Sequence, residues 1–217
     1  MNTSSPVPPR SPRWHVVIPA SGLSRRMGKP KLLLPFGSST VIGNLLQALS
    51  RSEIASINVV CREGDTALRD EVRSWGCRVM IPPIDSPDMR SSVEFGLESI
   101  AAADDPAVED GWILIPADHP LVTPGTLDRL FEFWVAKSPT ILVPTFQGKR
   151  GHPTLFRWET ASLVSRIPPN RGINWLLRES GLPVAELAVG DPLVVEDLDT
   201  PEDYERLRNA SAPPGPA

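Results

Sequence analysis

Residues 16–35 read VVIPASGLSRRMGKPKLLLP. The first four residues are apolar, which favours a buried strand. The run that follows is rich in glycine, serine and cations, which is typical of a loop. A buried strand that leads into a flexible cationic loop is expected where a chain holds an anion at the carboxyl end of a parallel sheet.

The residues of this loop suit a polyphosphate. Gly22 and Gly28 let the backbone turn sharply and let its amides approach an anion closely. Ser24 adds a hydroxyl donor, and Arg26 and Lys31 add positive charge for phosphate oxygens. The spacing matches neither the G-x-x-x-x-G-K-[ST] phosphate loop nor the G-x-G-x-x-G dinucleotide fingerprint. A solvated surface loop of the same composition is the alternative.

The composition is that of a globular protein with one substantial core. The chain has 217 residues, 41% of them hydrophobic and 22% charged, with a formal net charge of −4. The negative balance argues against nucleic-acid binding, and no apolar run approaches the ~20 residues that span a bilayer. Cys61 and Cys77 form neither a metal motif nor a disulfide framework. We therefore expect buried free thiols and a reducing, cytoplasmic environment.

Strand-like apolar runs alternate with helical patterns along most of the chain. Strands are expected at 14–20, 56–61, 77–82, 111–117 and 140–146, with further candidates at 183–188 and 192–196. Helices are expected between them, at 158–166, near 172–179 and from Thr200 onward. This alternation predicts an α/β fold, a three-layer doubly wound sandwich with a mostly parallel central sheet. The Pro- and Ser-rich ends predict a disordered extension at 1–13 and a disordered tail at 210–217, around one domain at 14–209.

Ligands of such folds bind beyond the carboxyl ends of the strands, which directs attention to further polar residues. Asp118 follows the strand expected at 111–117, where a carboxylate is well placed to hold Mg²⁺. A helix cap or turn is the alternative for this aspartate. Ser91 and Ser92 are expected at a helix start, where their hydroxyls and amides can bind an anion or simply cap the helix.

The motif G-x-S-x-R-M-G-x-P-K at residues 22–31 resembles the signature of the nucleotidyltransferases that act on the molybdenum cofactor. The branch it resembles most is that of the molybdenum cofactor cytidylyltransferase-like (MobA-like) proteins. Four further elements match in order: PDMRSSVEFGL, IPADHPLV, GHPTLF and DLDTPEDY. The similarity therefore extends over residues 16–204 and implies a nucleotide-diphospho-sugar transferase-like fold.

The resemblance also implies an activity and a set of site residues. It implies transfer of CMP from CTP to a phosphorylated acceptor, molybdopterin, with release of pyrophosphate. Mg²⁺, or Mn²⁺, would be held by Asp118 and by one of Asp197 and Asp199, of which we favour Asp199. The catalytic residues would be Arg26, Lys31 and Asp118. The nucleotide would contact Pro19, Ala20, Ser21, Gly22, Ser24, Arg26, Lys31, Ser91 and Ser92. The acceptor would contact His152 and Asn170, and a molybdenum enzyme is a candidate protein partner. All of this requires Lys31 and Asp118 to share one cleft.

The sequence departs from the family pattern at several positions. Pro19 and Ser21 replace the usual Leu and the second Ala or Gly, and the second of these lies where relatives discriminate among bases. His119 replaces Gln or Met, and Asn170 stands near the position of the usual Asp. These changes affect the base and the acceptor more than the phosphate chemistry. Two alternatives stay open: a nucleotidyltransferase for a sugar or alcohol phosphate, and a non-catalytic nucleotide-binding factor for molybdenum enzyme maturation.

Overall fold

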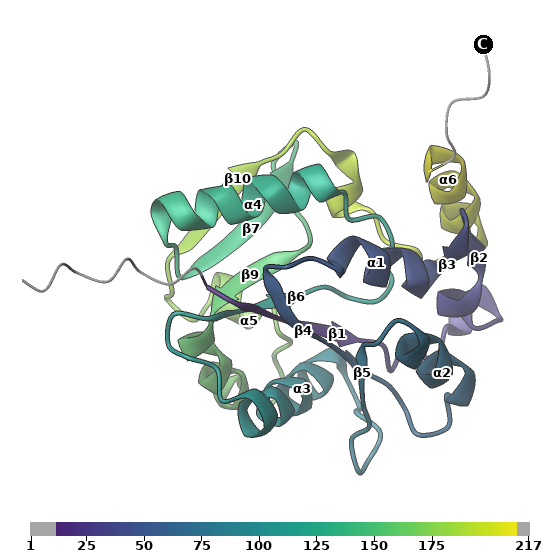
Figure 1. Ribbon diagram of the computed structural model, residues 1–217, viewed down its shortest axis with the longest axis horizontal. Coiled ribbons are helices and arrows are strands. Elements are labelled where there is room, and N and C mark those ends of the chain that lie inside the picture. Colours follow the sequence, from purple (N-terminus) through teal and green to yellow (C-terminus); the bar gives the residue numbers. More distant parts are fainter. Residues whose placement is uncertain (1–11, 212–217) are drawn as a thin grey trace, which may run out of the picture.

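The computed structural model describes residues 12–211, which form a mostly parallel sheet with helices on both faces (Figure 1). The strands are β1 (Trp14–Pro19), β2 (Pro35–Phe36), β3 (Ser39–Thr40), β4 (Ile54–Val60), β5 (Arg78–Met80), β6 (Gly111–Leu114), β7 (Ile141–Phe146), β8 (Lys149–Arg150), β9 (Thr154–Arg157) and β10 (Val184–Ala188). The α-helices are α1 (Val41–Leu49), α2 (Thr66–Ser74), α3 (Met89–Asp104), α4 (Pro124–Lys137), α5 (Trp175–Arg178) and α6 (Pro201–Ser211). Short 3-10 helices are η1 (Arg25–Met27), η2 (Lys31–Leu33), η3 (Trp158–Arg166) and η4 (Pro192–Val195).

The main sheet confirms the predicted α/β sandwich. Its strands lie in the order β10-β7-β9-β6-β1-β4-β5, and β8 pairs with β7. β1 runs parallel to β4 and β6, and β10 runs parallel to β7, whereas β9 is antiparallel to both β6 and β7. Val17 of β1 lies opposite Leu114 of β6, and beyond them Ala117 donates its backbone N–H to the Pro19 carbonyl at 3.4 Å. The loops after β1 and β6 therefore begin side by side.

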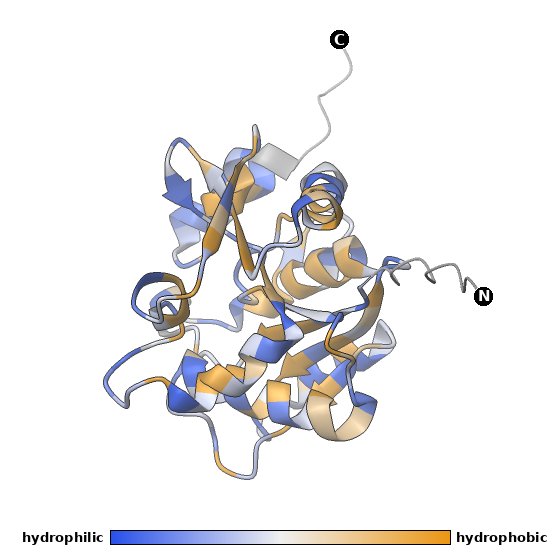
Figure 2. Ribbon diagram, turned by 90° about the vertical axis from the view of Figure 1, so that its left-hand side faces the viewer, coloured by the Kyte–Doolittle hydropathy of each residue, from blue (hydrophilic) through white to orange (hydrophobic). Residues whose placement is uncertain are grey.

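Successive residues of β1 pack into two cores, one on each face of the sheet. Val16 and Ile18 pack with apolar residues of α1 and α4, and Val17 packs with those of α3. All three side chains are fully buried. Figure 2 shows apolar segments running through the strands in the middle of the molecule and hydrophilic segments on the outer sides of the helices. This near-continuous apolar character is what a strand covered on both faces requires.

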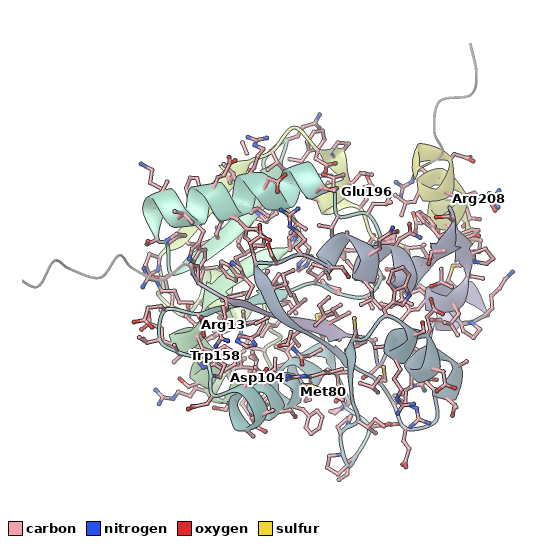
Figure 3. The ribbon with its side chains drawn as sticks, in the orientation of Figure 1. Arg13, Met80, Asp104, Trp158, Glu196 and Arg208 are labelled. Atoms are coloured by element: carbon pink, nitrogen blue, oxygen red, sulfur yellow. The ribbon has the colours of Figure 1, made fainter. Side chains whose placement is uncertain are left out.

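His15 lies at the end of the sheet opposite to the carboxyl ends of the parallel strands. Its ring is 1% exposed, with Nδ1 2.9 Å from Ser56 Oγ and 3.4 Å from an Asp104 carboxylate oxygen. Figure 3 labels Asp104, Trp158 and Arg13 around this end of the sheet. Burial lowers the pKa of His15, although neighbouring carboxylates, that of Asp104 first, raise it. The imidazole is therefore neutral at pH 7 and belongs to the packing of the sheet.

Several elements of the second half differ from the sequence prediction. Residues 192–196, predicted as a strand, contain the 3-10 helix η4, because Pro192 begins a turn in which the Asp191 carboxylate accepts from the backbone N–H of Leu193. The helix expected at 158–166 is also a 3-10 helix. The antiparallel strand β9 at 154–157 was not predicted, since its four residues follow a turn-like Gly-His-Pro run.

The predictions for the chain ends and for the two cysteines compare with the structure as follows. The predictions for 1–13 and 210–217 fall mostly outside the described residues, although α6 extends through Ser211. Cys61 is a buried free thiol, and burial raises its pKa to about 12, whereas Cys77 is only half-buried. None of the helices between residues 12 and 211 has both the length and the apolar character needed to cross a bilayer.

A substitution at Gly111, the first residue of β6, tests the packing of the sheet. A Cβ at this position would lie 2.3 Å from a ring carbon of Trp14 and 2.9 Å from the Phe156 carbonyl oxygen. We expect Gly111→Ala to lower the free energy of unfolding by about 1–3 kcal/mol, as overpacking does. The matched control is Gly125→Ala in α4, where a Cβ meets nothing within 4 Å. Urea unfolding of both variants gives the comparison, and equal midpoints would contradict the packing argument.

Candidate active site

A cleft of about 560 Å³ opens at the carboxyl ends of β1 and β6. The loop after β1, the segment before α3, the end of β6 and Asp199 line it together. Ten predicted site residues contribute to this lining: Pro19, Ala20, Ser21, Gly22, Ser24, Arg26, Lys31, Ser92, Asp118 and Asp199. Three predicted residues, Ser91, His152 and Asn170, do not line it. The structure thus collects the predicted nucleotide and metal residues in one place and leaves the predicted acceptor residues outside it.

Lys31 stands at the centre of this cleft. Its Nζ donates to Asp118 Oδ2 at 2.9 Å, to Asp199 Oδ1 at 2.9 Å and to the Leu198 carbonyl at 2.7 Å. The side chain is only 11% exposed. Burial by itself lowers the pKa of Lys31, but the carboxylates of Asp118 and Asp199 outweigh burial and raise it. Lys31 is therefore a fully charged ammonium that joins three segments far apart in the sequence.

Arg26, which lies earlier in the same loop, reaches one of these two carboxylates, that of Asp199. Its Nη2 lies 2.7 Å from Asp199 Oδ2, and its side chain is 71% exposed. The loop turns back on itself through Ser24 and Gly28, whose φ angles are +48° and +66°. Ser24 Oγ also accepts from the backbone N–H of Lys31 at 3.4 Å. The loop conformation therefore directs both cations to one side of the cleft.

Serine hydroxyls join the first loop to the start of α3. Ser21 Oγ donates to the Val60 carbonyl at 3.2 Å and accepts from Ser92 Oγ at 3.4 Å. Ser91 behaves differently, because the carboxylate of Asp88 caps the helix by accepting from its backbone N–H and hydroxyl at 2.8 and 2.9 Å. The cap of α3 is therefore Asp88, and Ser91 provides the backbone N–H that is capped.

His152 and Asn170 do not line the main cleft. The His152 ring packs edge-on against His119 with centroids 4.7 Å apart, and its Nδ1 is 3.4 Å from the Leu114 carbonyl oxygen. Asn170 is exposed and lines a second cavity of about 460 Å³. Asp88 and Met89 line both this cavity and the main cleft. The sequence analysis named Ser91 and Ser92 at this helix start but missed Asp88, although an aspartate directly before a helix is a capping signal.

The donor set of the cleft fits a divalent cation that arrives with phosphate ligands. Within residues 12–211 there is no group of three or more His, Cys, Asp or Glu side chains able to hold a metal ion. Asp118 and Asp199 nevertheless lie close enough for one ammonium to contact both. Mg²⁺ commonly takes one or two carboxylates and completes its shell with waters and substrate phosphates. Asp118 and Asp199 would supply these carboxylate ligands.

The comparison with known proteins agrees with this geometry. A model of the MobA-like NTP transferase domain matches residues 16–184, so the chain belongs to the MobA-like NTP transferase family. The chain is accordingly a nucleotidyltransferase. The resemblance seen in the loop motif and the fold it implied are confirmed.

Individual relatives cover nearly the whole chain. The chain is 28% identical over 211 residues to the purine catabolism protein PucB of Bacillus subtilis (strain 168), covering 93% of this chain and 98% of PucB. It is 28% identical over 200 residues to the molybdenum cofactor cytidylyltransferase of Escherichia coli (strain K12), covering 87% and 92%. The crystal structure of Rv0371c from Mycobacterium tuberculosis H37Rv superposes with a TM-score of 0.76 at 28% identity, covering 91% of this chain and 98% of that one. A structure of Rv0371c with manganese gives 0.71 at 27% identity, with coverages of 91% and 99%.

The imidazole of His152 makes the stability of the fold depend on pH. Burial and the neighbouring His119 lower the pKa of His152 from 6.5 to about 3, despite its bond to Leu114. A lowered folded-state pKa stabilises the fold above the unfolded pKa, and this contribution is lost as the pH falls from 6.5 toward 3. We expect unfolding temperatures to fall between pH 6.5 and 4.5, and the slope to be shallower in His152→Asn, which cannot titrate.

The measurement is a set of thermal unfolding curves at half-unit pH steps. One proton corresponds to about 1.4 kcal/mol per pH unit. At pH 8 both proteins carry a neutral side chain at 152, so any difference there reports packing alone. Parallel pH profiles for the two proteins would contradict a buried neutral imidazole.

Proposed function

We propose that this enzyme transfers CMP from CTP to the terminal phosphate of molybdopterin and releases pyrophosphate. The observation that carries the proposal is the convergence of Lys31, Asp118 and Asp199 beside a glycine- and serine-containing loop in one cleft. This arrangement provides both the positive charge and the carboxylates that a metal-bound triphosphate needs. A second support is the similarity, over 87% of the chain, to a protein of Escherichia coli whose name gives a cytidylyl group as what is transferred and the molybdenum cofactor as the acceptor.

The residues of the cleft divide the work of such a reaction. The backbone at 19–22 would contact the base and ribose, and Arg26 and Lys31 would bind the triphosphate. Asp118 and Asp199 would hold Mg²⁺ or Mn²⁺, and a manganese complex is known for the similar Rv0371c. The bound metal would screen the charge that develops as pyrophosphate leaves.

The bond changes are those of a direct displacement. An oxygen of the acceptor phosphate attacks the α-phosphorus of CTP, and the bond from that phosphorus to the bridging oxygen of the β-phosphate breaks. Such a displacement needs no covalent intermediate on the protein, so catalysis rests on alignment and charge stabilisation. Arg26 and Lys31 are suited to the second task because their charges are fixed at neutral pH.

The second cavity is the place that we propose for the acceptor. Asn170 lies in the second cavity, which meets the main cleft at Asp88 and Met89. An acceptor that reaches from one cavity into the other would touch Asn170 while its phosphate faces Lys31. Because Asn170 stands where relatives usually carry Asp, a sugar or alcohol phosphate is the alternative acceptor.

The proposal predicts which substrates release pyrophosphate. We expect release only when CTP and molybdopterin are both present with Mg²⁺ or Mn²⁺, with ATP, GTP and UTP giving lower rates. A coupled pyrophosphate assay over the four nucleotides, with molybdopterin or with sugar and alcohol phosphates, measures this. Release with another acceptor would replace molybdopterin in the proposal. Triphosphate binding without release under any combination would instead support a non-catalytic factor.

The metal role of Asp118 is tested by removing its charge. We expect Asp118→Asn to reduce the rate of pyrophosphate release by about 100-fold or more, as loss of a charge-stabilising group in an active site does. The matched control is Asp197→Asn, because Asp197 is exposed and does not line the cleft. Its rate should stay within about twofold of the unmodified enzyme, in keeping with surface substitutions. Unchanged nucleotide binding and release in Asp118→Asn would remove Asp118 from the metal site.

A further inference from the structure

The two aspartates proposed for the metal are held by the two cations proposed for the triphosphate. Lys31 Nζ lies 2.9 Å from an oxygen of Asp118 and 2.9 Å from one of Asp199, and Arg26 Nη2 lies 2.7 Å from the other oxygen of Asp199. Both oxygens of Asp199 therefore have a cationic partner. The aspartates proposed to bind the metal and the cations proposed to bind phosphate thus form ion pairs with each other.

Charge balance disfavours a metal on the same carboxylates while this arrangement persists. Two carboxylates and two cations sum to zero, so a divalent cation would bring the cluster to +2. A divalent cation coordinated by Asp118 and Asp199 would also lie within a few ångströms of the Lys31 ammonium, where repulsion at low dielectric is strong. A triphosphate supplies negative charge to both partners at once, and Arg26 and Lys31 can transfer to it.

We infer that Lys31 and Arg26 keep the metal site closed until the triphosphate arrives, so that metal and triphosphate bind as one coupled unit. This inference rests on the metal and phosphate roles proposed above. It adds that the protein alone binds the metal weakly because its own cations compete for the carboxylates. Coupling of this kind is reciprocal, so the metal must strengthen triphosphate binding by the same factor.

The surroundings of the two cations allow such a transfer. Arg26 is 71% exposed and Asp199 is 22% exposed, so their contact lies at the open side of the cleft. Lys31 also donates to the Leu198 carbonyl at 2.7 Å, an acceptor that stays available when the ammonium leaves the carboxylates. Arg26, Lys31 and both aspartates line the same cleft, so a ligand in this cleft is accessible to both cations.

The test measures Mn²⁺ binding by electron paramagnetic resonance, first without nucleotide and then with a non-hydrolysable α,β-methylene analogue of CTP or of GTP. The variants are Lys31→Met and Arg26→Gln, which each remove one competing cation. Lys29→Met is the matched control, because this substitution removes the same charge from the same loop. Lys29 is exposed and does not line the cleft.

Competition predicts a defined order of Mn²⁺ affinities without nucleotide. Lys31→Met should bind about tenfold more tightly than the unmodified protein, since it frees two carboxylate contacts. Arg26→Gln, which frees one, should gain less, and Lys29→Met should not change. The factor by which the nucleotide analogue strengthens Mn²⁺ binding should be smaller in Lys31→Met than in the unmodified protein. Nucleotide-free Mn²⁺ affinity in Lys31→Met that is equal to or weaker than in Lys29→Met overturns the inference.

Thermal unfolding separates competition from a purely structural role of Lys31. Loss of the ammonium leaves Asp118 and Asp199 in mutual repulsion, so Lys31→Met should unfold at a lower temperature with a chelator present. Added Mn²⁺ should raise its unfolding temperature more than that of the unmodified protein. A loss of stability that Mn²⁺ does not restore would show a structural role and overturn the inference. If the unmodified protein binds neither Mn²⁺–analogue complex, the proposed function itself fails, which is a distinct result.

Discussion

The site depends on one buried ammonium. The side chain of Lys31 is only 11% exposed, and a charge in that position is tolerated only if its donors are satisfied. Two carboxylates and a backbone carbonyl satisfy all three of them. These acceptors come from the segment after β6 and from the segment before α6, which lie 87 and 168 residues along the chain from Lys31. The requirement to neutralise one charge therefore holds together three parts of the sequence.

The sheet brings these segments close enough for that contact. β1 and β6 are neighbours in parallel register, so the loop with Lys31 and the turn with Asp118 leave the sheet at the same edge. The backbone N–H of Leu198 donates to the Asp118 carbonyl at 2.9 Å, which fixes Asp199 beside them. Strand pairing sets the position of the charges, and ion pairing then sets the orientation of the side chains. Strand pairing and ion pairing together therefore place these cations and carboxylates in the lining of one cleft.

The sequence predicted the first half of the fold well and named many of the residues that line the cleft, for a physical reason. Near-continuous apolar strands such as β1 have one stable arrangement, and residue types such as Gly28, Arg26 and Lys31 carry their chemistry in any loop geometry. The prediction was weaker where long-range contacts decide the outcome. β9 forms because β6 and β7 offer an open position between them, and nothing local in its four residues reveals that position. Ser91 likewise gives its amide to Asp88, a choice between capping and anion binding that composition leaves open.

The main cleft and the second cavity are held by different interactions, and this bears on how substrates can differ among relatives. The main cleft is fixed by the β1–β6 ladder and by Lys31. Beside the second cavity, Arg90 joins α3 to the second half of the chain by donating to the carbonyls of Ile167 and Pro168, at 2.8 and 3.3 Å. Two hydrogen bonds from one side chain constrain a segment less than a strand ladder does. A change at the exposed Asn170 can therefore alter the second cavity without displacing the residues that line the main cleft, so the proposed acceptor can change while the proposed phosphate chemistry is retained.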